Sequence, residues 1–113
     1  MTEEKPSKDL FERLRVQDPE RLIAWLSDGS LEHHLLTYAA EFAGDVPSDY
    51  VEKAREALLD LLAHQRAYVR EGAVYGLSKL PVTQEVMDAL TKLTSNLEPS
   101  TDVRETAMEA LVT

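Results

Sequence analysis

A 34-residue period runs through this chain. The stretch YVREGAVYGLSKL begins at Tyr68, and DVRETAMEALVT begins at Asp102 with Val, Arg, Glu, Ala and Leu in the same places. With a weaker third copy, the apolar positions in this register are Leu35, Ala39 and Ala43; Val69, Ala73 and Leu77; and Val103, Ala107 and Leu111. The spacing i, i+4, i+8 aligns each triplet on one helical face, and the central alanine lets a neighbouring helix approach closely. The repeat therefore predicts three buried helices that pack on one another.

A second helical pattern precedes each of these helices, so the repeating unit is a helix pair. The preceding patterns begin near Glu20, Tyr50 and Thr83. Prolines mark the boundaries beside residues that cap helix N-termini, and Asp49 with Glu52 has the spacing of a capping box. No strand or hairpin pattern occurs. We expect an all-α, right-handed stack of about seven helices, near residues 8–16, 19–28, 31–43, 49–64, 67–79, 84–96 and 102–112.

The length of 113 residues suits one domain rather than two independent cores. We divide the single domain, residues 1–113, into an N-terminal tail and helix (1–17) and three repeats (18–46, 47–80 and 81–113). The chain has no cysteine, which excludes disulfides, Cys-based zinc sites and a thiol nucleophile. The N-terminus lacks the basic and apolar regions of a signal peptide, and no apolar stretch is long enough to span a membrane. We therefore expect a soluble, cytoplasmic protein that does not bind membranes.

The phrase VREGAVYGL, which follows LLDLLAHQRAY, resembles the HEAT repeat, particularly the HEAT-like form of bacteria. The resemblance covers residues 18–113, is strongest in the last two repeats, and implies a HEAT-like α-solenoid. It also implies that Arg70 and Arg104 make structural hydrogen bonds near the start of the second helix of each unit. HEAT units commonly carry an Asp shortly before this point, which ties neighbouring units together. This chain departs from that pattern, with Ser30, His64 and Glu98 in the corresponding places.

The net charge of −9 is unevenly distributed along the chain. Residues 22–52 contain no Lys or Arg, and their acidic residues are Asp28, Glu32, Glu41, Asp45, Asp49 and Glu52. Such a surface repels a phosphate backbone and attracts a basic protein, so nucleic-acid binding is disfavoured. Acidic surfaces also keep small proteins in solution, and the charge alone does not decide between the two interpretations.

The side of the repeat helices opposite the buried triplets is free for binding. Translation by 34 residues gives a grid of His34, Thr37 and Glu41; Tyr68, Glu71 and Tyr75; and Asp102, Glu105 and Glu109. The HEAT resemblance implies that the grid lines a concave face. Tyrosines offer large contact areas with few rotatable bonds, and carboxylates receive Lys or Arg. With Tyr38 taken in place of its neighbour Thr37, the candidate partner-binding residues are His34, Tyr38, Glu41, Tyr68, Glu71, Tyr75, Asp102, Glu105 and Glu109. The alternative is an ordinary solvated helix face.

The sequence predicts no catalytic residue, no metal site and no cofactor. Adjacent His33 and His34 point in different directions on a helix and cannot share a metal as i and i+4 ligands do. His64 is expected at a helix C-terminus, where a partly charged imidazole is favourable. There is no Gly-rich phosphate loop, and the serines lack a base and carboxylate to activate them. We therefore expect that the protein is not an enzyme.

The leading functional prediction is a non-catalytic module that binds a basic protein surface through the grid and the acidic first repeat. A bacterial inhibitor or immunity-type protein is one form of such a module. The alternatives are a phycobilin-lyase-like component, by resemblance of its repeats, and a HEAT-like nucleic-acid enzyme, which the acidic grid disfavours. The last helix ends with Met108, Leu111 and Val112 and has no polar capping unit. It therefore either continues a longer array or belongs to a monomer or weak homodimer that pairs through this helix.

Overall fold

A computed structural model describes residues 5–112, which form helices and connecting turns without a strand in that range. The elements are α1 (Lys8–Gln17), α2 (Pro19–Leu26), α3 (His33–Ala43), the 3-10 turn η1 (Ser48–Tyr50), α4 (Val51–Leu61), α5 (Ala67–Ser78), α6 (Gln84–Leu93) and α7 (Thr101–Val112). The all-α expectation is confirmed. Residues 1–4 of the predicted tail and residue 113 of the last repeat lie outside the described residues. None of the helices within residues 5–112 combines the length and apolarity that a membrane span requires.

Helix starts follow the capping residues that the sequence places beside prolines. The side chains of Asp18, Thr83 and Ser100 each accept a hydrogen bond from the backbone N–H three residues later, at 3.3, 3.2 and 3.3 Å. These bonds satisfy N–H groups that have no partner inside the helix. The predicted capping box of Asp49 and Glu52 is wrong, because the chain forms η1 over Ser48–Tyr50 and α4 begins without a side-chain cap.

Two helix ends fall three residues earlier than the sequence predicts. The helices expected to reach residues 64 and 96 end at Leu61 and Leu93. After each end the backbone tightens, with Leu62 N–H bonding Leu59 C=O at 3.2 Å and Thr94 bonding Thr91 in the same way at 3.1 Å. Bonds of this i to i−3 type close the last turn of a helix and satisfy carbonyls that would otherwise lack partners.

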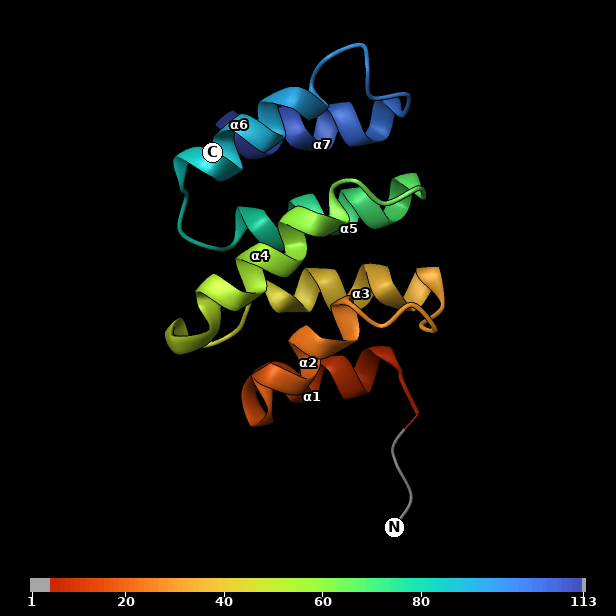
Figure 1. Cartoon of the computed structure of the whole chain (residues 1–113), viewed down its shortest axis with the longest axis vertical. Helices are drawn as coiled ribbons and strands as arrows, with labels where there is room; N and C mark the ends of the chain where they lie inside the picture. Colours follow the sequence, from red (N-terminus) through yellow and green to blue (C-terminus); the bar gives the residue numbers. More distant parts are fainter. Residues whose placement is uncertain (1–4, 113) are drawn as a thin grey trace.

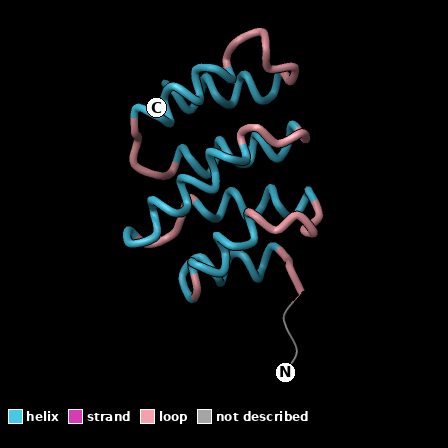
Figure 2. Tube along the Cα trace, viewed as in Figure 1, coloured by secondary structure: helices cyan, strands magenta, loops and turns pink. Residues whose placement is uncertain are grey.

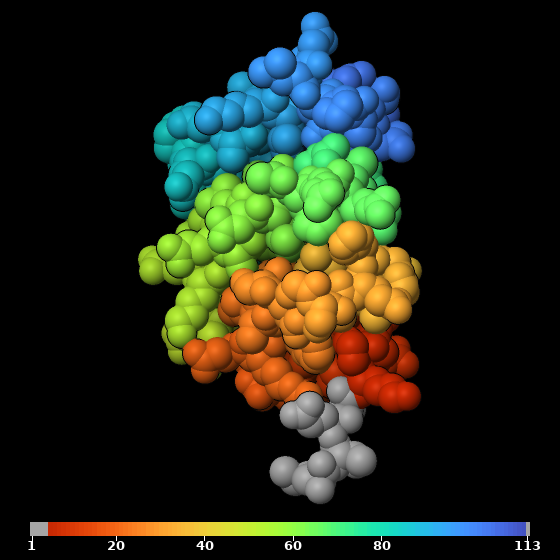
Figure 3. Space-filling model, turned by 45° about the vertical axis from the view of Figure 1, so that its right-hand side comes forward, coloured from red at the N-terminus to blue at the C-terminus, as the bar shows by residue number. Residues whose placement is uncertain are grey.

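The helices form two layers along the long axis of the molecule, and they follow one another in sequence order (Figure 1). In the first layer, α1, α3, α5 and α7 pack one on the next, and α2, α4 and α6 form the second layer, each against the helix that follows it. Figure 2 shows the loops that join the layers, and the colour bands of Figure 3 show successive segments stacked along the axis. The molecule measures 48 × 27 × 17 Å. Its end helices in the first layer are α1 and α7.

The repeat positions fill the interior between the layers. Ala39, Ala73 and Ala107, the central members of the triplets, are completely buried. Leu35 is only half-buried, and its neighbour Leu36 is buried in the place that arginines take in the later repeats. Apart from this exchange and from Leu111 in the last helix, which is half-buried, the predicted inner face matches the observed core.

Glycines bring α3 and α5 into close backbone contact. A Cβ atom on Gly72 would lie 3.0 Å from the Thr37 carbonyl oxygen, and one on Gly76 would collide with the carbonyl of Ala40. Gly44, at the end of α3, faces Gly76 in the same way. The backbones approach this closely only because these positions carry no side chain.

Candidate protein-binding face

The candidate residues come from α3, α5 and α7, the consecutive helices of the first layer, and all are exposed or half-buried. Contacts between these helices place them beside one another. The Thr37 hydroxyl donates to the Tyr68 carbonyl at 3.0 Å, and the Thr106 hydroxyl donates to Glu71 Oε2 at 3.0 Å. We refer to Tyr38, Glu41, Tyr68, Glu71, Tyr75, Glu105 and Glu109 as the tyrosine-acid face.

The two other predicted members, His34 and Asp102, are exposed and also have local structural roles. His34 Nε2 is 3.3 Å from Glu32 Oε2, so its contact is with the loop before α3. Asp102 lies in the first turn of α7, where a carboxylate stabilises the positive end of the helix dipole. Both side chains remain exposed, and their part in binding stays a prediction.

Tyr68 and Tyr75 are the large, open side chains of the face. They are 45% and 40% exposed and stand two turns apart on α5, about 10 Å along the axis. Tyr38 is half-buried and packs against the core. Exposed aromatic rings on a rigid helix are the kind of side chain that dominates binding energies at protein interfaces.

A small hollow lies between α5 and α7 beside Tyr75. Its volume is about 180 Å³, and its walls include Val74, Tyr75, Thr106 and Glu109. The hollow joins an aromatic ring to a carboxylate within one site. It suits the aliphatic stem and charged head of one Lys or Arg side chain, because such side chains bury the stem and keep the charge accessible.

The acids of the face differ in environment. Burial raises the pKa of Glu41 above its usual value, nearby Glu71 adds to this rise, and Lys79 and Lys8 oppose it. Glu105 and Glu109 are exposed on α7. A cation placed between α3 and α5 would relieve the unfavourable burial and repulsion that act on Glu41.

Lys8 already makes a contact of this kind within the chain. Its Nζ lies 5.2 Å from the centre of the Tyr38 ring, which is within cation–π distance, and its charge acts on Glu41. The α3 part of the face therefore receives a lysine from α1, whereas Tyr68 and Tyr75 remain exposed.

Bases from elsewhere in the chain reduce the acidity of the first repeat. Lys79, on the following repeat, pairs with Asp45 at 3.2 Å and donates to the Glu41 carbonyl at 3.0 Å. The run of residues 22–52 without Lys or Arg is therefore partly neutralised in three dimensions. The sequence did not reveal this pair, because Lys79 lies 34 residues after Asp45 along the chain.

A buried ion pair that the sequence pattern did not predict links the last two repeats. Arg70 Nε and Nη2 donate to the two carboxylate oxygens of Glu98 at 2.7 Å each, and both side chains are almost fully buried. Arg70 Nη1 also donates to the backbone carbonyls of His64 and Gln65, and Arg104 Nη1 donates to that of Glu98. The predicted structural role of both arginines is confirmed. Glu98 thus ties the turn before α7 to α5.

The charges around Glu98 decide its protonation. Burial by itself would raise its pKa, but hydrogen bonds from Arg70 and from the Ser100 N–H, with the charges of Arg70 and Arg104, hold the pKa below its usual value. The carboxylate is therefore ionised and fully engaged, which removes it from consideration as a general base.

The expectation of a partly charged His64 is wrong. Burial, helped by His33 and by the charges of Arg70 and Arg66, lowers the pKa of His64. Its Nδ1 accepts the Arg66 N–H at 3.0 Å, an arrangement that requires this nitrogen to be unprotonated, and its ring lies edge-on to His33 at 4.9 Å. Within residues 5–112, no group of three or more His, Cys, Asp or Glu side chains is arranged to hold a metal ion.

Comparisons with known proteins were made for the whole chain. No protein-family model, curated protein or solved structure matches it significantly.

Proposed function

We propose that this chain is a short, right-handed solenoid of HEAT-like repeats. Three observations support the proposal. The repeat alanines are buried in the same way on α3, α5 and α7, these helices stack consecutively, and the pair of Arg70 and Glu98 ties one repeat to the next. A helix pair of this size cannot bury both of its faces alone, which favours stacking on copies of itself.

The function proposed for this solenoid is non-catalytic binding of a protein with a basic surface through the tyrosine-acid face. The observation that carries it is the exposure of Tyr68 and Tyr75, at 45% and 40%, beside carboxylates of α5 and α7. Helix solvation does not require exposed aromatic rings at i and i+7, and clustered exposed apolar groups are typical of interaction sites. An inhibitor or immunity-type protein that covers the basic site of another protein is one such module.

The contact of Lys8 with Tyr38, together with the effect of its charge on Glu41, supports the chemistry of this proposal. It pairs a cation with a ring and a carboxylate, and the same groups recur around Tyr75, Glu109 and the hollow between α5 and α7. A partner Lys or Arg would make equivalent contacts there. The acids also steer a basic partner toward the face before contact is made.

The environment of the carboxylates favours binding over catalysis. A catalytic carboxyl group generally needs an enclosed apolar setting that shifts its pKa toward neutrality. Glu105 and Glu109 are exposed, and Glu98, the most buried acid, is held ionised by two arginines. These groups are suited to pairing with cations rather than to proton transfer.

Affinity capture tests the proposal. The immobilised protein is expected to retain basic proteins from a cell lysate at low salt and to release them at high salt, because exposed charge pairs are screened. The double substitution Tyr68→Ala/Tyr75→Ala should abolish retention without unfolding the protein. The matched control Val82→Ala/Met87→Ala removes two exposed apolar side chains elsewhere and should retain the same proteins.

Association rates test the charged part of the tyrosine-acid face. Glu105→Lys/Glu109→Lys should slow association with a captured partner and flatten its salt dependence, since steering acts mainly on the association rate. Asp49→Lys/Asp60→Lys makes the same change of net charge at two exposed acids outside the face and serves as the control. Retention of neutral or acidic proteins, or indifference to the tyrosine substitutions, would contradict the proposed function.

A further inference from the structure

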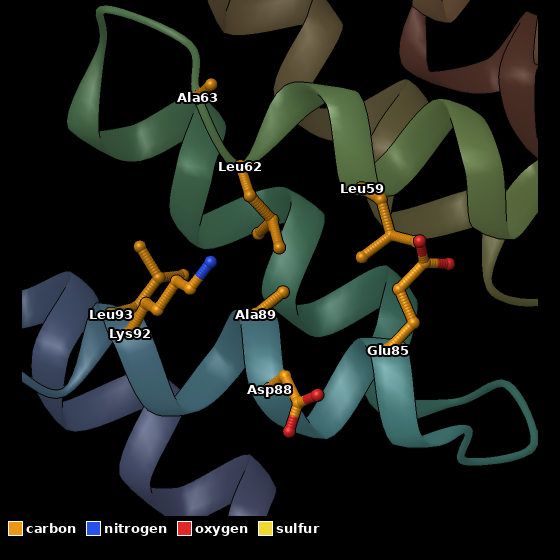
Figure 4. A pocket seen from close by; sticks show the side chains of 8 residues that line it. All are labelled: Leu59, Leu62, Ala63, Glu85, Asp88, Ala89, Lys92 and Leu93. Carbon is orange, nitrogen blue, oxygen red and sulfur yellow. The ribbon is translucent and has the colours of Figure 1, made fainter.

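The second layer is open between α4 and α6. α2 packs against α4, but α4 and α6 make no comparable contact. A groove of about 680 Å³ separates them, and its apolar floor consists of Leu59 and Leu62 from one side and Ala89 and Leu93 from the other. Figure 4 shows the two leucines at α4 extending toward α6, with Ala89 facing them. We call this the α4–α6 groove.

The groove continues along the full length of both helices. A hollow of about 330 Å³ shares Leu59 and Glu85 with it and reaches the N-terminal ends of α4 and α6. Another of about 510 Å³ shares Leu93 with it and reaches Leu97, which is 92% exposed. The ten residues of α6 give the groove a length of about 15 Å.

The N-terminal end of the groove carries unpaired acids. Glu52 and Glu56 of α4 and Glu85 of α6 line this end, and none of them forms an ion pair within residues 5–112. Three carboxylates without a cation beside an apolar floor favour a ligand that brings positive charge to this end.

The bases at the same end are engaged by the chain itself. Lys53 Nζ pairs with Glu20 at 2.9 Å, and Arg55 Nη2 donates to the Pro81 carbonyl at 2.9 Å. At the other end, Lys92 lies in the last turn of α6, and Arg70 is paired with Glu98. Asp88 lines the middle of the groove, so negative charge extends from the N-terminal end to the middle and Lys92 supplies positive charge at the C-terminal end.

We propose that the α4–α6 groove binds an amphipathic α-helix of another protein. The helix is about three turns long, presents leucine-like side chains to Leu59, Leu62 and Leu93, and carries Lys or Arg in its C-terminal turn against Glu52, Glu56 and Glu85. This direction is antiparallel to α4 and α6 and places cations where they also stabilise the ligand helix. The site is separate from the tyrosine-acid face and does not depend on it.

The apolar floor selects a helix over other peptide conformations. The described chain has no sheet edge that could pair with the backbone of an extended peptide. A helix satisfies its own backbone hydrogen bonds and can bury one apolar face without leaving polar groups unpaired. A second copy of this chain is a poor occupant because its net charge is also −9, which sets acids against acids.

The probe for the test is a labelled 14-residue peptide (about four turns) with leucines at i, i+3, i+4 and i+7 and three lysines at its C-terminal end. Fluorescence anisotropy should show saturable binding, and a peptide with glutamates in place of the lysines should bind at least about tenfold more weakly. Ala89→Glu, which fills and charges the floor with a good helix former, should weaken binding of the lysine peptide by about tenfold or more.

Matched variants separate this site from the tyrosine-acid face. Glu56→Lys/Glu85→Lys changes exposed residues only and should reduce binding even if Ala89→Glu disturbs the fold, whereas Tyr68→Ala/Tyr75→Ala should leave peptide binding unchanged. Equal binding of both peptides, or full binding by the Glu56→Lys/Glu85→Lys variant, would overturn the proposal. So would sedimentation that finds a dimer of the wild type and a monomer of Ala89→Glu, since a second copy would then be the occupant.

Discussion

The hydrogen bonds of Glu98 show how single residues hold consecutive repeats together. Its carboxylate accepts from Arg70 at 2.7 Å and from the Ser100 N–H at 2.9 Å, while its carbonyl accepts from Arg104. Removing charges from water costs several kcal/mol per ion, roughly, and is offset only when the pair is well aligned and its remaining groups are bonded. This pair meets both conditions.

Removing one partner of this pair should strongly destabilise the folded protein. Arg70→Ala leaves the buried Glu98 carboxylate without its cation and should cost about 3–5 kcal/mol in the free energy of unfolding, measured with urea. Because the pKa of Glu98 is held below its usual value, the contribution of the pair is present at neutral pH and is lost as the pH falls through that lowered pKa.

Two further variants test whether the loss of stability arises from the pair of Arg70 and Glu98. Arg70→Met/Glu98→Leu should lose less stability than Arg70→Ala alone, since it leaves no unpaired charge. Lys53→Ala, which breaks the exposed pair with Glu20, should change little. A small effect of Arg70→Ala would show that the buried pair does not support the fold.

The arginine half of this pair could be predicted from sequence and the glutamate half could not. Arg70 and Arg104 occupy repeat positions, so their structural role follows from the pattern. Glu98 lies in the turn between α6 and α7, whose path the repeat pattern leaves unspecified. Lys79 and Asp45 were missed for a similar reason, since their contact depends on how tightly α3 and α5 pack.

His64 provides a pH-dependent test at the same scale. Its pKa is lowered in the folded protein, so the unfolded chain binds the proton first, and stability should be complete above about pH 6.5 and fall as the pH decreases below it. His64→Asn keeps an acceptor for the Arg66 N–H and should flatten the urea-unfolding profile in this range. An unaltered profile in His64→Asn would assign the dependence elsewhere.

At the scale of elements, the first layer is continuous and the second is not. α3, α5 and α7 pack consecutively, with glycines where α3 meets α5, and this brings their outward faces into one surface. α4 and α6 stand apart and leave a groove. The two candidate binding surfaces thus have different origins. The tyrosine-acid face arises where α3, α5 and α7 pack on one another, and the α4–α6 groove arises where α4 and α6 do not.

The contact between α3 and α5 should be sensitive to a single methyl group. Gly76→Ala places a Cβ against the Ala40 carbonyl and the Leu58 side chain, and overpacking of this kind costs about 1–3 kcal/mol. Gly29→Ala is the control, because no atom lies within 4 Å of the added Cβ. Thermal unfolding should show a loss for the first variant and no loss for the second. Equal melting temperatures would mean that the helices can separate at no cost.

Helix positions were predictable because period, capping residues and prolines agree, and most ends lie within two residues of expectation. The groove was not predictable. Ala89 and Leu93 fit an ordinary amphipathic helix, and nothing in their spacing distinguishes a helix that meets α4 from one that stands away from it. The exposure of Tyr68 and Tyr75 was predictable from the face opposite the buried triplet, whereas the contact of Lys8 with Tyr38 depends on how α1 is placed.

At the scale of the whole molecule, stacking in sequence order leaves an apolar surface at the end formed by α6 and α7. Met87 and Met108 are 41% and 46% exposed, and Val82 and Val112 are 70% and 85% exposed. A hollow of about 230 Å³ beside them is lined almost entirely by apolar side chains, among them Leu111. The last helix therefore carries the exposed apolar surface that the sequence predicts, and a cluster of apolar groups is in contact with water there.

Weak pairing through α7 is the prediction that this end surface supports. A two-fold axis would bring the same patch from two copies together, which is the commonest route to a closed dimer. One helix face offers less than the roughly 1,200 Å² that stable interfaces bury, and the net charge of −9 on each copy opposes contact. Sedimentation should therefore find a monomer that self-associates only at high protein concentration, more strongly as added salt screens the repulsion.

Met108→Glu/Val112→Glu should abolish the association. Leu111→Glu is a poorer test, because Leu111 is half-buried and its substitution would also weaken the core. Association that persists in the Met108→Glu/Val112→Glu variant would place the contact on another surface, and a tight dimer at low concentration would show that more than one helix face is buried.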